Sequence, residues 1–313
     1  MLKPKALRLG DTLGFVAPSS PVKTLDSVDK SVEAARALGY KVVVGESCRS
    51  AHGYLAGDDQ MRVGDLNRMF ADDSIDGIIA IRGGYGAPRI LDKLDYRLAA
   101  QHPKLLAGYS DITALHIAYG QKSGLVTMHA PMPSTEWIQD GYDGFTASGL
   151  WRALTATEPL GPVLNPPDCP LETLNGGVAH GRLAGGNLSL ITALNGTPWE
   201  IDARGAILVL EDVGEYIDRL DRMLTTLRLS GKFDQCAGIV LGGFTDCKPE
   251  YPDRSLTIRQ AIEEVVLPSG KPVVSGYMIG HCSPKVTIPL GVAATLDADR
   301  CLLTIDEAAL TGP

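Results

Sequence analysis

Residues 105–115, LLAGYSDITAL, hold the two elements that indicate the fold. An apolar run leads directly into a helical pattern, with a serine at the junction. The same alternation fills residues 13 to about 130 and is typical of βα units on a parallel sheet. We predict a Rossmann- or flavodoxin-like parallel sheet domain, with strands at 13–17, 41–44, 77–81, 104–108 and 125–129 and helices near 25–38, 58–70, 87–93 and 111–122.

The second half of the chain predicts another α/β domain. Between about 134 and 180 the pattern gives way to Gly, Pro and Asp, which favours a connecting segment. Strands are predicted at 206–210, 238–241 and 272–276, then a β-rich tail, and an amphipathic helix at about 216–229. We therefore expect a fold of the α/β class, with an N-terminal domain at 1–150, a linker at 151–180 and a C-terminal domain at 181–313.

Composition narrows the function classes. The 313 residues carry 29 basic and 37 acidic side chains, a formal charge of −8 without a Lys/Arg cluster, which disfavours nucleic acid or an anionic membrane as partner. No run of about 20 apolar residues and no export signal is present, so we expect a cytoplasmic protein. The six scattered cysteines form no C-x-x-C pair and indicate reduced thiols. Glycine, with 35 residues, is the one residue type whose share of the chain is unusually high.

Ser110 has the sequence context of a nucleophile elbow, in which a tight turn lifts a serine above the sheet. The backbone amide of Asp111, at the start of the following helix, would then face a developing oxyanion. The match to G-x-S-x-G is partial, because Ile112 replaces the last glycine. Local sequence by itself favours the alternative, in which Ser110 or Asp111 caps the helix.

A glycine-rich loop, Arg82-Gly83-Gly84-Tyr85-Gly86, follows the strand predicted at 77–81. Ligands of parallel sheets bind beyond the carboxyl ends of the strands, and glycine lets a backbone amide approach them closely. A phosphate cradle is weakly supported because G-K-[ST] and a complete G-x-G-x-x-G are absent. A plain tight turn remains the alternative, and Arg82 is a candidate for holding a carboxylate.

Two acids end the strand predicted at 206–210, and a histidine follows a later strand. Glu211 is placed to orient an imidazole by accepting its Nδ1 proton, whereas Asp212 suits the start of the next helix. His281 is a candidate general base, although a lone loop histidine is more often a surface residue. Cys282 is discounted as a dyad partner because adjacent side chains seldom face each other. The other histidines lack metal-ligand spacing, so we expect no metal site.

Taken together, Ser110, Glu211, His281 and the glycine loop supply a nucleophile, an orienting acid, a base and amide donors near strand ends. This combination favours a serine hydrolase, and the chain order Ser, Glu, His also occurs in α/β-hydrolases. Because the serine and its partners belong to different predicted domains, we expect the active site in the cleft between them.

The complete set of motifs resembles the LD-carboxypeptidase family, the serine peptidases known as muramoyltetrapeptide carboxypeptidases. The resemblance extends from Gly10-Asp11 to the β-rich tail. The motifs that carry it are RGGYG at 82–86, GYSD at 108–111, GGNL at 185–188, LEDVGE at 210–215, RLDR at 219–222, GH at 280–281 and PLG at 289–291.

The resemblance implies a Ser-Glu-His triad of Ser110, Glu211 and His281. Glu215 is a competing acid, but Glu211 holds the strand-end position of the family motif.

The resemblance also implies an oxyanion hole formed by the amide of Asp111 and one amide of the glycine loop, that of Gly84 or Tyr85. Arg82 is our candidate for the substrate carboxylate, because a guanidinium grips a carboxylate with two hydrogen bonds. The implied reaction releases terminal D-alanine from the L-centred diamino acid of cytoplasmic murein tetrapeptides during cell-wall recycling. We expect no cofactor. The resemblance also suggests a homodimer.

Two alternatives stay open at this point. Relatives that detoxify peptidyl-nucleotide antibiotics tend to be longer and carry an aromatic-bearing insertion, whereas the stretch from Glu211 to His281 is compact and has no tryptophan. A non-catalytic two-lobed protein that binds a peptide or sugar is the second alternative, and covalent labelling of Ser110 would separate it from an enzyme.

Overall fold

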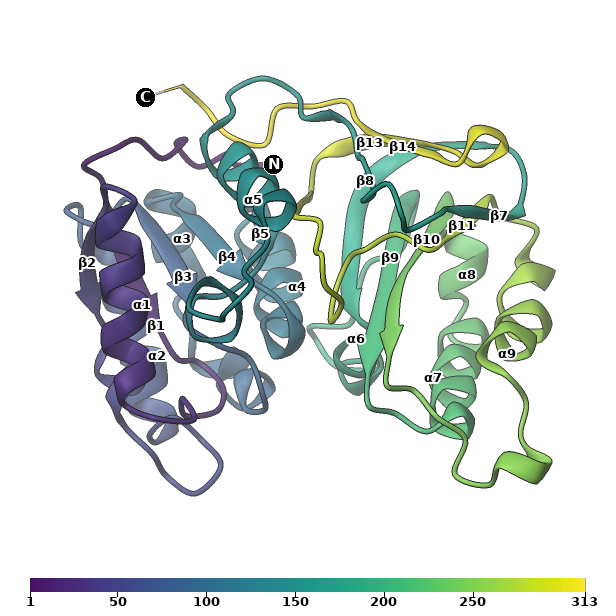
Figure 1. Ribbon diagram of the computed structural model, residues 1–313, viewed down its shortest axis with the longest axis horizontal. Coiled ribbons are helices and arrows are strands. Elements are labelled where there is room, and N and C mark those ends of the chain that lie inside the picture. Colours follow the sequence, from purple (N-terminus) through teal and green to yellow (C-terminus); the bar gives the residue numbers. More distant parts are fainter. Residues whose placement is uncertain (313) are drawn as a thin grey trace. The chain divides into compact units, whose positions relative to one another are not determined.

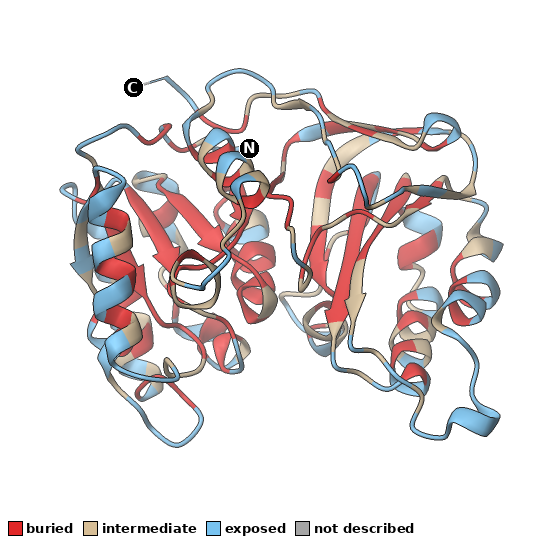
Figure 2. Ribbon diagram, viewed as in Figure 1, coloured by how far each residue is buried: buried red, intermediate tan, exposed pale blue. Residues whose placement is uncertain are grey.

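The computed structural model describes residues 1–312, and the chain divides into two compact units. Unit 1 consists of Met1–Pro159, Thr287–Gly291 and Ala308–Pro313, and unit 2 of Leu160–Val286 and Val292–Glu307. Each unit has a sheet whose strands are largely buried, with helices that expose their outer faces (Figures 1 and 2). The two-domain α/β fold with an N-terminal parallel sheet agrees with the prediction.

Unit 1 contains a six-stranded sheet in the order β12-β5-β4-β3-β1-β2. The first five strands of the chain are parallel, and β12 is antiparallel to β5. The order 2-1-3-4-5 of the parallel strands is that of flavodoxin-like folds. The strands are β1 (Thr12–Val16), β2 (Lys41–Val44), β3 (Gly77–Ala80), β4 (Leu105–Gly108), β5 (Thr127–His129) and β12 (Ile288–Leu290).

The helices of unit 1 follow from capping and from apolar spacing. The Asp58 carboxylate accepts the amide of Met61 at 2.8 Å and starts α2, whose inner face includes Leu66, Met69 and Phe70. The helices are α1 (Asp26–Ala37), α2 (Asp59–Ala71), α3 (Tyr96–Gln101), α4 (Thr113–Lys122) and α5 (Gly144–Thr155).

Unit 2 contains an eight-stranded mixed sheet in the order β6-β14-β13-β8-β9-β10-β11-β7. The central strands β8 to β11 are parallel and the outer strands antiparallel. The strands are β6 (Gly161–Pro162), β7 (Glu172–Asn175), β8 (Val178–Asn187), β9 (Ala206–Val213), β10 (Gly238–Thr245), β11 (Val273–Ser275), β13 (Ala293–Asp297) and β14 (Leu302–Ile305). The helices are α6 (Leu188–Ala193), α7 (Ile217–Leu229), α8 (Lys232–Gln235) and α9 (Ile258–Val265).

The structure differs from the sequence predictions in several elements. The range 151–180, predicted as a linker, contains the end of α5, then β6, β7 and the first residues of β8, and from Leu160 onward it belongs to unit 2. Residues 287–291 return to unit 1, where β12 pairs with β5. The helix predicted at 87–93 is a 3₁₀ helix, α3 was not predicted, and β9 continues three residues past Leu210.

Parallel pairing brings the candidate loops of unit 1 to one edge of its sheet. Strands β3 and β4 are neighbours, with Gly77 opposite Leu105, so the segments that follow them leave the sheet side by side. These segments are the glycine loop at 82–86 and the junction at Ser110. In the described part of the chain, residues 1–312, no helix is long and apolar enough to cross a membrane.

Candidate active site

Ser110 lies in a strained turn between β4 and α4. Its φ of +66° is in the left-handed region, which costs a non-glycine residue about 1–3 kcal/mol and is most often found at functional sites. A short 3₁₀ helix, Ser110–Ile112, then leads into α4, and neither helix has a side-chain hydrogen bond at its N-cap. The backbone geometry is that of an elbow, and the N-cap residues of the two helices are Tyr109 and Ile112.

The Asp111 carboxylate, instead of capping the helix, ties together two loops beside Ser110. It is buried, and its Oδ2 accepts the Ser19 hydroxyl at 2.5 Å and the Ala87 amide at 2.7 Å. Ser19 follows β1, and Ala87 directly follows the glycine loop. Burial raises the pKa of Asp111 to about 6, and these hydrogen bonds oppose the shift.

Arg62 is a second brace for the same loops, and the sequence analysis missed it. Its buried guanidinium donates from Nη1 to the carbonyls of Pro18 at 2.6 Å and Gly86 at 2.8 Å, and from Nη2 to Asp59. Arg62 occupies a buried position of α2, where an apolar residue is the rule. The sequence signal that could have identified Arg62 is a charged residue among the apolar positions of a predicted helix.

The glycine loop lies directly against the Ser110 side chain. A Cβ added to Gly83 would stand 2.9 Å from Ser110 Cβ and 3.1 Å from Ser110 Oγ, so a larger residue would displace the serine. The Tyr85 amide donates to Ser20 Oγ at 3.0 Å and is thereby occupied. No hydrogen bond of the Gly84 amide occurs in residues 1–312, which favours Gly84 over Tyr85 as the loop's oxyanion donor.

Arg82 follows β3 and is half-buried. Its Nη1 donates to the Pro21 carbonyl at 2.6 Å, while Nε is buried without a hydrogen-bond partner in the described chain. Burial lowers the pKa of Arg82, and no carboxylate within residues 1–312 forms an ion pair with it. A desolvated guanidinium with unused donors suits an anionic ligand.

Unit 2 places the predicted acid and base in direct contact. Glu211, fully buried on β9, accepts from His281, with Oε2 2.7 Å from Nδ1 and 3.2 Å from the backbone amide. Because an ionised carboxylate can only accept, this bond assigns a proton to Nδ1. Gly280 has φ of +101°, and a Cβ there would overlap the Glu211 carboxylate, so glycine is required at this close approach.

The neighbouring acids serve other contacts. Asp212 accepts the Ser189 amide at 2.9 Å, the Ser189 hydroxyl at 2.8 Å and the Asn187 side chain at 3.0 Å. It therefore fixes the start of α6, and not the start of α7 as predicted. Glu215 faces Arg219 at 3.9 Å. Burial raises the pKa of Cys282 to about 11, which makes it a poor nucleophile at neutral pH.

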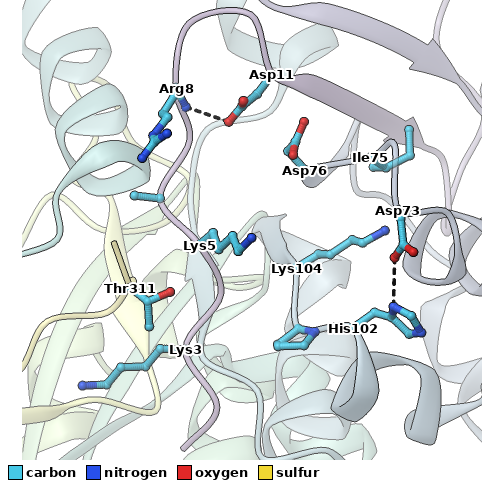
Figure 3. Close-up of a pocket in the computed structure, with 12 residues that line it drawn as sticks. Lys3, Lys5, Arg8, Asp11, Asp73, Ile75, Asp76, His102, Lys104 and Thr311 are labelled. Carbon is cyan, nitrogen blue, oxygen red and sulfur yellow. Dashed lines mark hydrogen bonds and ion pairs between the residues drawn. The ribbon is translucent and has the colours of Figure 1, made fainter. Parts of the chain in front are cut away.

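A pocket of about 470 Å³ in unit 1 is lined by Asp11, Asp76 and Lys104, among others (Figure 3). These residues directly precede β1, β3 and β4, so the pocket lies at the edge of the sheet where the strands begin, whereas Ser110 follows the end of β4. The polar groups of the pocket hold the local backbone. The Arg8 amide donates to Asp11 at 2.8 Å, and Lys104 Nζ donates to the Met69 carbonyl at 2.9 Å. We assign this pocket no part in the site.

Comparison with known proteins identifies the family. Two family models match, described as the LD-carboxypeptidase N-terminal domain over residues 13–130 and C-terminal domain over residues 180–296. A probable murein peptide carboxypeptidase of Bacillus subtilis (strain 168) is 40% identical and aligns with 99% of this chain and 96% of its own. The chain belongs to the LD-carboxypeptidase family. It is a serine-type carboxypeptidase, a hydrolase.

Solved structures of two similar proteins share the fold. MccF in complex with glutamyl sulfamoyl guanosine has a TM-score of 0.91 at 26% identity, covering 99% of this chain and 100% of its own. A muramoyltetrapeptide carboxypeptidase from Oxalobacter formigenes has a TM-score of 0.83 at 28% identity, covering 96% and 99%. This chain is thus similar both to murein-directed enzymes and to MccF.

Proposed function

We propose that the protein is a cytoplasmic enzyme of cell-wall recycling that removes terminal D-alanine from murein tetrapeptides. The observation that carries this proposal is the 2.7 Å hydrogen bond between buried Glu211 and His281, a prepared acid and base for serine chemistry. Ser110, on its strained elbow, is the proposed nucleophile. The proposed triad requires His281 Nε2 to reach Ser110 Oγ during the reaction.

The proposed reaction has two halves. His281 Nε2 takes the proton of Ser110 Oγ, which attacks the carbonyl carbon of the L-residue and forms a tetrahedral oxyanion. The C–N bond then breaks, His281 protonates the leaving amine of D-alanine, and an ester on Ser110 remains. Water attacks this ester with His281 again as base, which releases the tripeptide acid and restores the serine.

The oxyanion would be stabilised by backbone amides at the elbow. We assign the Asp111 amide, at the start of a helix, and the Gly84 amide, in the loop that packs on Ser110. Bracing of this loop by Arg62 and by the Asp111 carboxylate fixes the donor before the substrate arrives.

Arg82 is assigned to the substrate's terminal carboxylate, supported by its unpartnered Nε and its position two residues beyond β3. An Arg82→Ala variant should lose kcat/KM on free-carboxylate substrates and lose discrimination against amidated ones. Unchanged kcat/KM together with unchanged discrimination would remove Arg82 from this role.

A second candidate is hydrolysis of a peptidyl nucleotide, because MccF binds glutamyl sulfamoyl guanosine in its solved structure. Murein is favoured by the 40% identity to the probable murein peptide carboxypeptidase of B. subtilis. The absence of tryptophan between Glu211 and His281 also disfavours a base-stacking insertion in this part of the chain.

Mass spectrometry of murein tetrapeptide incubated with the protein tests the proposal. The expected product has lost one alanine, and Ser110→Ala should abolish this loss. An intact tetrapeptide together with cleavage of an aminoacyl sulfamoyl nucleotide would support the second candidate instead. Sizing of the native protein by light scattering tests the homodimer that we also propose.

A further inference from the structure

Two exposed tyrosines stand together on loops at the carboxyl edge of the unit 1 sheet. Tyr54 is 64% and Tyr85 50% exposed, and their ring centroids lie 5.7 Å apart at an angle of 60°. Tyr54 lies in the connection between β2 and α2, and Tyr85 in the glycine loop after β3. Both connections leave the end of the sheet from which Ser110 follows β4.

The backbone that carries Tyr85 is held firmly. Its amide donates to Ser20 Oγ at 3.0 Å, the carbonyl of Gly86 accepts from Arg62 at 2.8 Å, and the amide of Ala87 donates to Asp111 at 2.7 Å. The ring is therefore presented to solvent by a loop whose conformation is fixed on both sides. Rigid exposed aromatic rings are typical anchors in binding sites, because little entropy is lost when a ligand covers them.

The Tyr54 segment is tied to the same loop. Leu55 is 3% exposed and packs on Gly86, where an added Cβ would lie 2.8 Å from its Cδ2. The Ala56 amide donates to the Ser19 carbonyl at 2.9 Å, and the hydroxyl of the same serine donates to Asp111. The two rings thus share one braced support, although they come from separate connections.

The pair is within reach of a peptide attached at Ser110. Gly83 packs on the Ser110 side chain, and Tyr85 is two residues further, at most about 7 Å along the backbone. The three residues of a tetrapeptide that precede the scissile bond span about 10 Å when extended. The leaving residue is a single alanine, whose methyl side chain can make only a small contact with the two tyrosine rings.

From this placement we propose that Tyr54 and Tyr85 form a binding platform for the peptide stem that stays on the enzyme as the acyl group. The proposal rests on the function proposed above and adds the part of the substrate that the rings contact. Aromatic faces stack on amide planes and on methylene groups, both of which such a stem supplies. The platform contributes to binding of the stem and takes no part in bond breaking.

The test compares Tyr54→Ala, Tyr85→Ala and Tyr85→Phe on two substrates with the same scissile bond, the tetrapeptide and the dipeptide of its last two residues. The two alanine variants should raise KM for the tetrapeptide roughly tenfold, the loss of one anchor, with kcat unchanged. They should leave kcat/KM for the dipeptide unchanged, and Tyr85→Phe should behave as wild type. Leu9→Ala removes a 79% exposed apolar side chain near the opposite edge of the sheet and serves as the matched control.

Unchanged KM for the tetrapeptide in both alanine variants would overturn the platform. Equal losses on the tetrapeptide and the dipeptide would also overturn it, because they would show a disturbed loop. Labelling of Ser110 by a fluorophosphonate, in every variant, separates these results from failure of the proposed function. If the wild-type protein is neither labelled nor active, the function and the platform fall together.

Discussion

Asp111→Asn has a pH signature that can be worked out from the structure. Burial raises the pKa of the Asp111 carboxyl from an ordinary 3.8 to about 6, so the folded protein holds this proton more tightly than the unfolded chain. Stability from this group is fully present below pH 3.8 and is lost as the pH rises through 6. A shift of about 2 units corresponds to about 3 kcal/mol in total, of which about 2 kcal/mol falls between pH 4 and pH 8.

Asparagine does not titrate, so the variant lacks the pH-dependent stability that the Asp111 carboxyl contributes. The free energy of unfolding of the variant, relative to that of wild type, should therefore rise by about 2 kcal/mol between pH 4 and pH 8. For a unit of this size that corresponds to about 4–8 °C in the difference between the two Tm values. Any constant cost of burying the amide cancels in this comparison. Differential scanning calorimetry at both pH values measures it, with Asp92→Asn, at an exposed carboxylate, as the control.

A Tm difference between Asp111→Asn and wild type that stays constant from pH 4 to pH 8 would mean that folding does not raise the pKa of the Asp111 carboxyl. A change of the opposite sign would refute the prediction as well, because it would mean that the native state favours the ionised carboxylate. Asp92→Asn should give the same Tm difference at both pH values.

Three further substitutions have expected outcomes. Glu211→Gln should lower kcat roughly 10⁴-fold without unfolding the protein, as steady-state kinetics and circular dichroism would show. Arg62→Met leaves two buried carbonyls, one of them on Gly86, without a donor and should cost about 2–5 kcal/mol in urea unfolding; a loss below 1 kcal/mol would contradict the bracing role. Gly83→Ala should displace Ser110 and lower kcat on the order of 10²-fold, and wild-type kcat would show that the loop yields freely.

The elements of unit 1 were predictable where apolar periodicity is strong. Strand β2 was predicted at its observed bounds, and β1, β3, β4 and β5 within two residues at each end, because continuous apolar runs mark buried parallel strands. Strand β12 was not predicted, since three residues with a central Pro289 carry no local strand signal and pair only with a distant segment.

Strand β8 was hidden by its glycines, which lower strand propensity. In the structure these glycines are required by a close neighbour. A Cβ on Gly181 would overlap the Gly205 carbonyl, and one on Gly185 would overlap the Val209 carbonyl of β9. The reason for glycine is thus a contact between strands, which local sequence does not display.

Some contacts at the candidate site were predictable from the sequence, and others depend on segments that are far apart in the chain. The sequence predicted that Glu211 would accept from His281, and the structure contains this hydrogen bond. The prediction was possible because Glu211 lies near the end of the recognisable strand β9 and His281 follows β11. The brace formed by Arg62, Asp111 and Ser19 joins three connections far apart in the chain. Such a network arises only when the sheet has assembled, so no spacing in the sequence announces it.

We propose that Ser110 is the nucleophile of a murein tetrapeptide carboxypeptidase. The most direct test of this proposal is tandem mass spectrometry of the protein after reaction with a fluorophosphonate, with and without saturating tetrapeptide. We expect a single modified residue, Ser110, and protection of that residue by the tetrapeptide. Modification of another residue, or release of D-alanine by a protein whose Ser110 never reacts, would contradict the proposal.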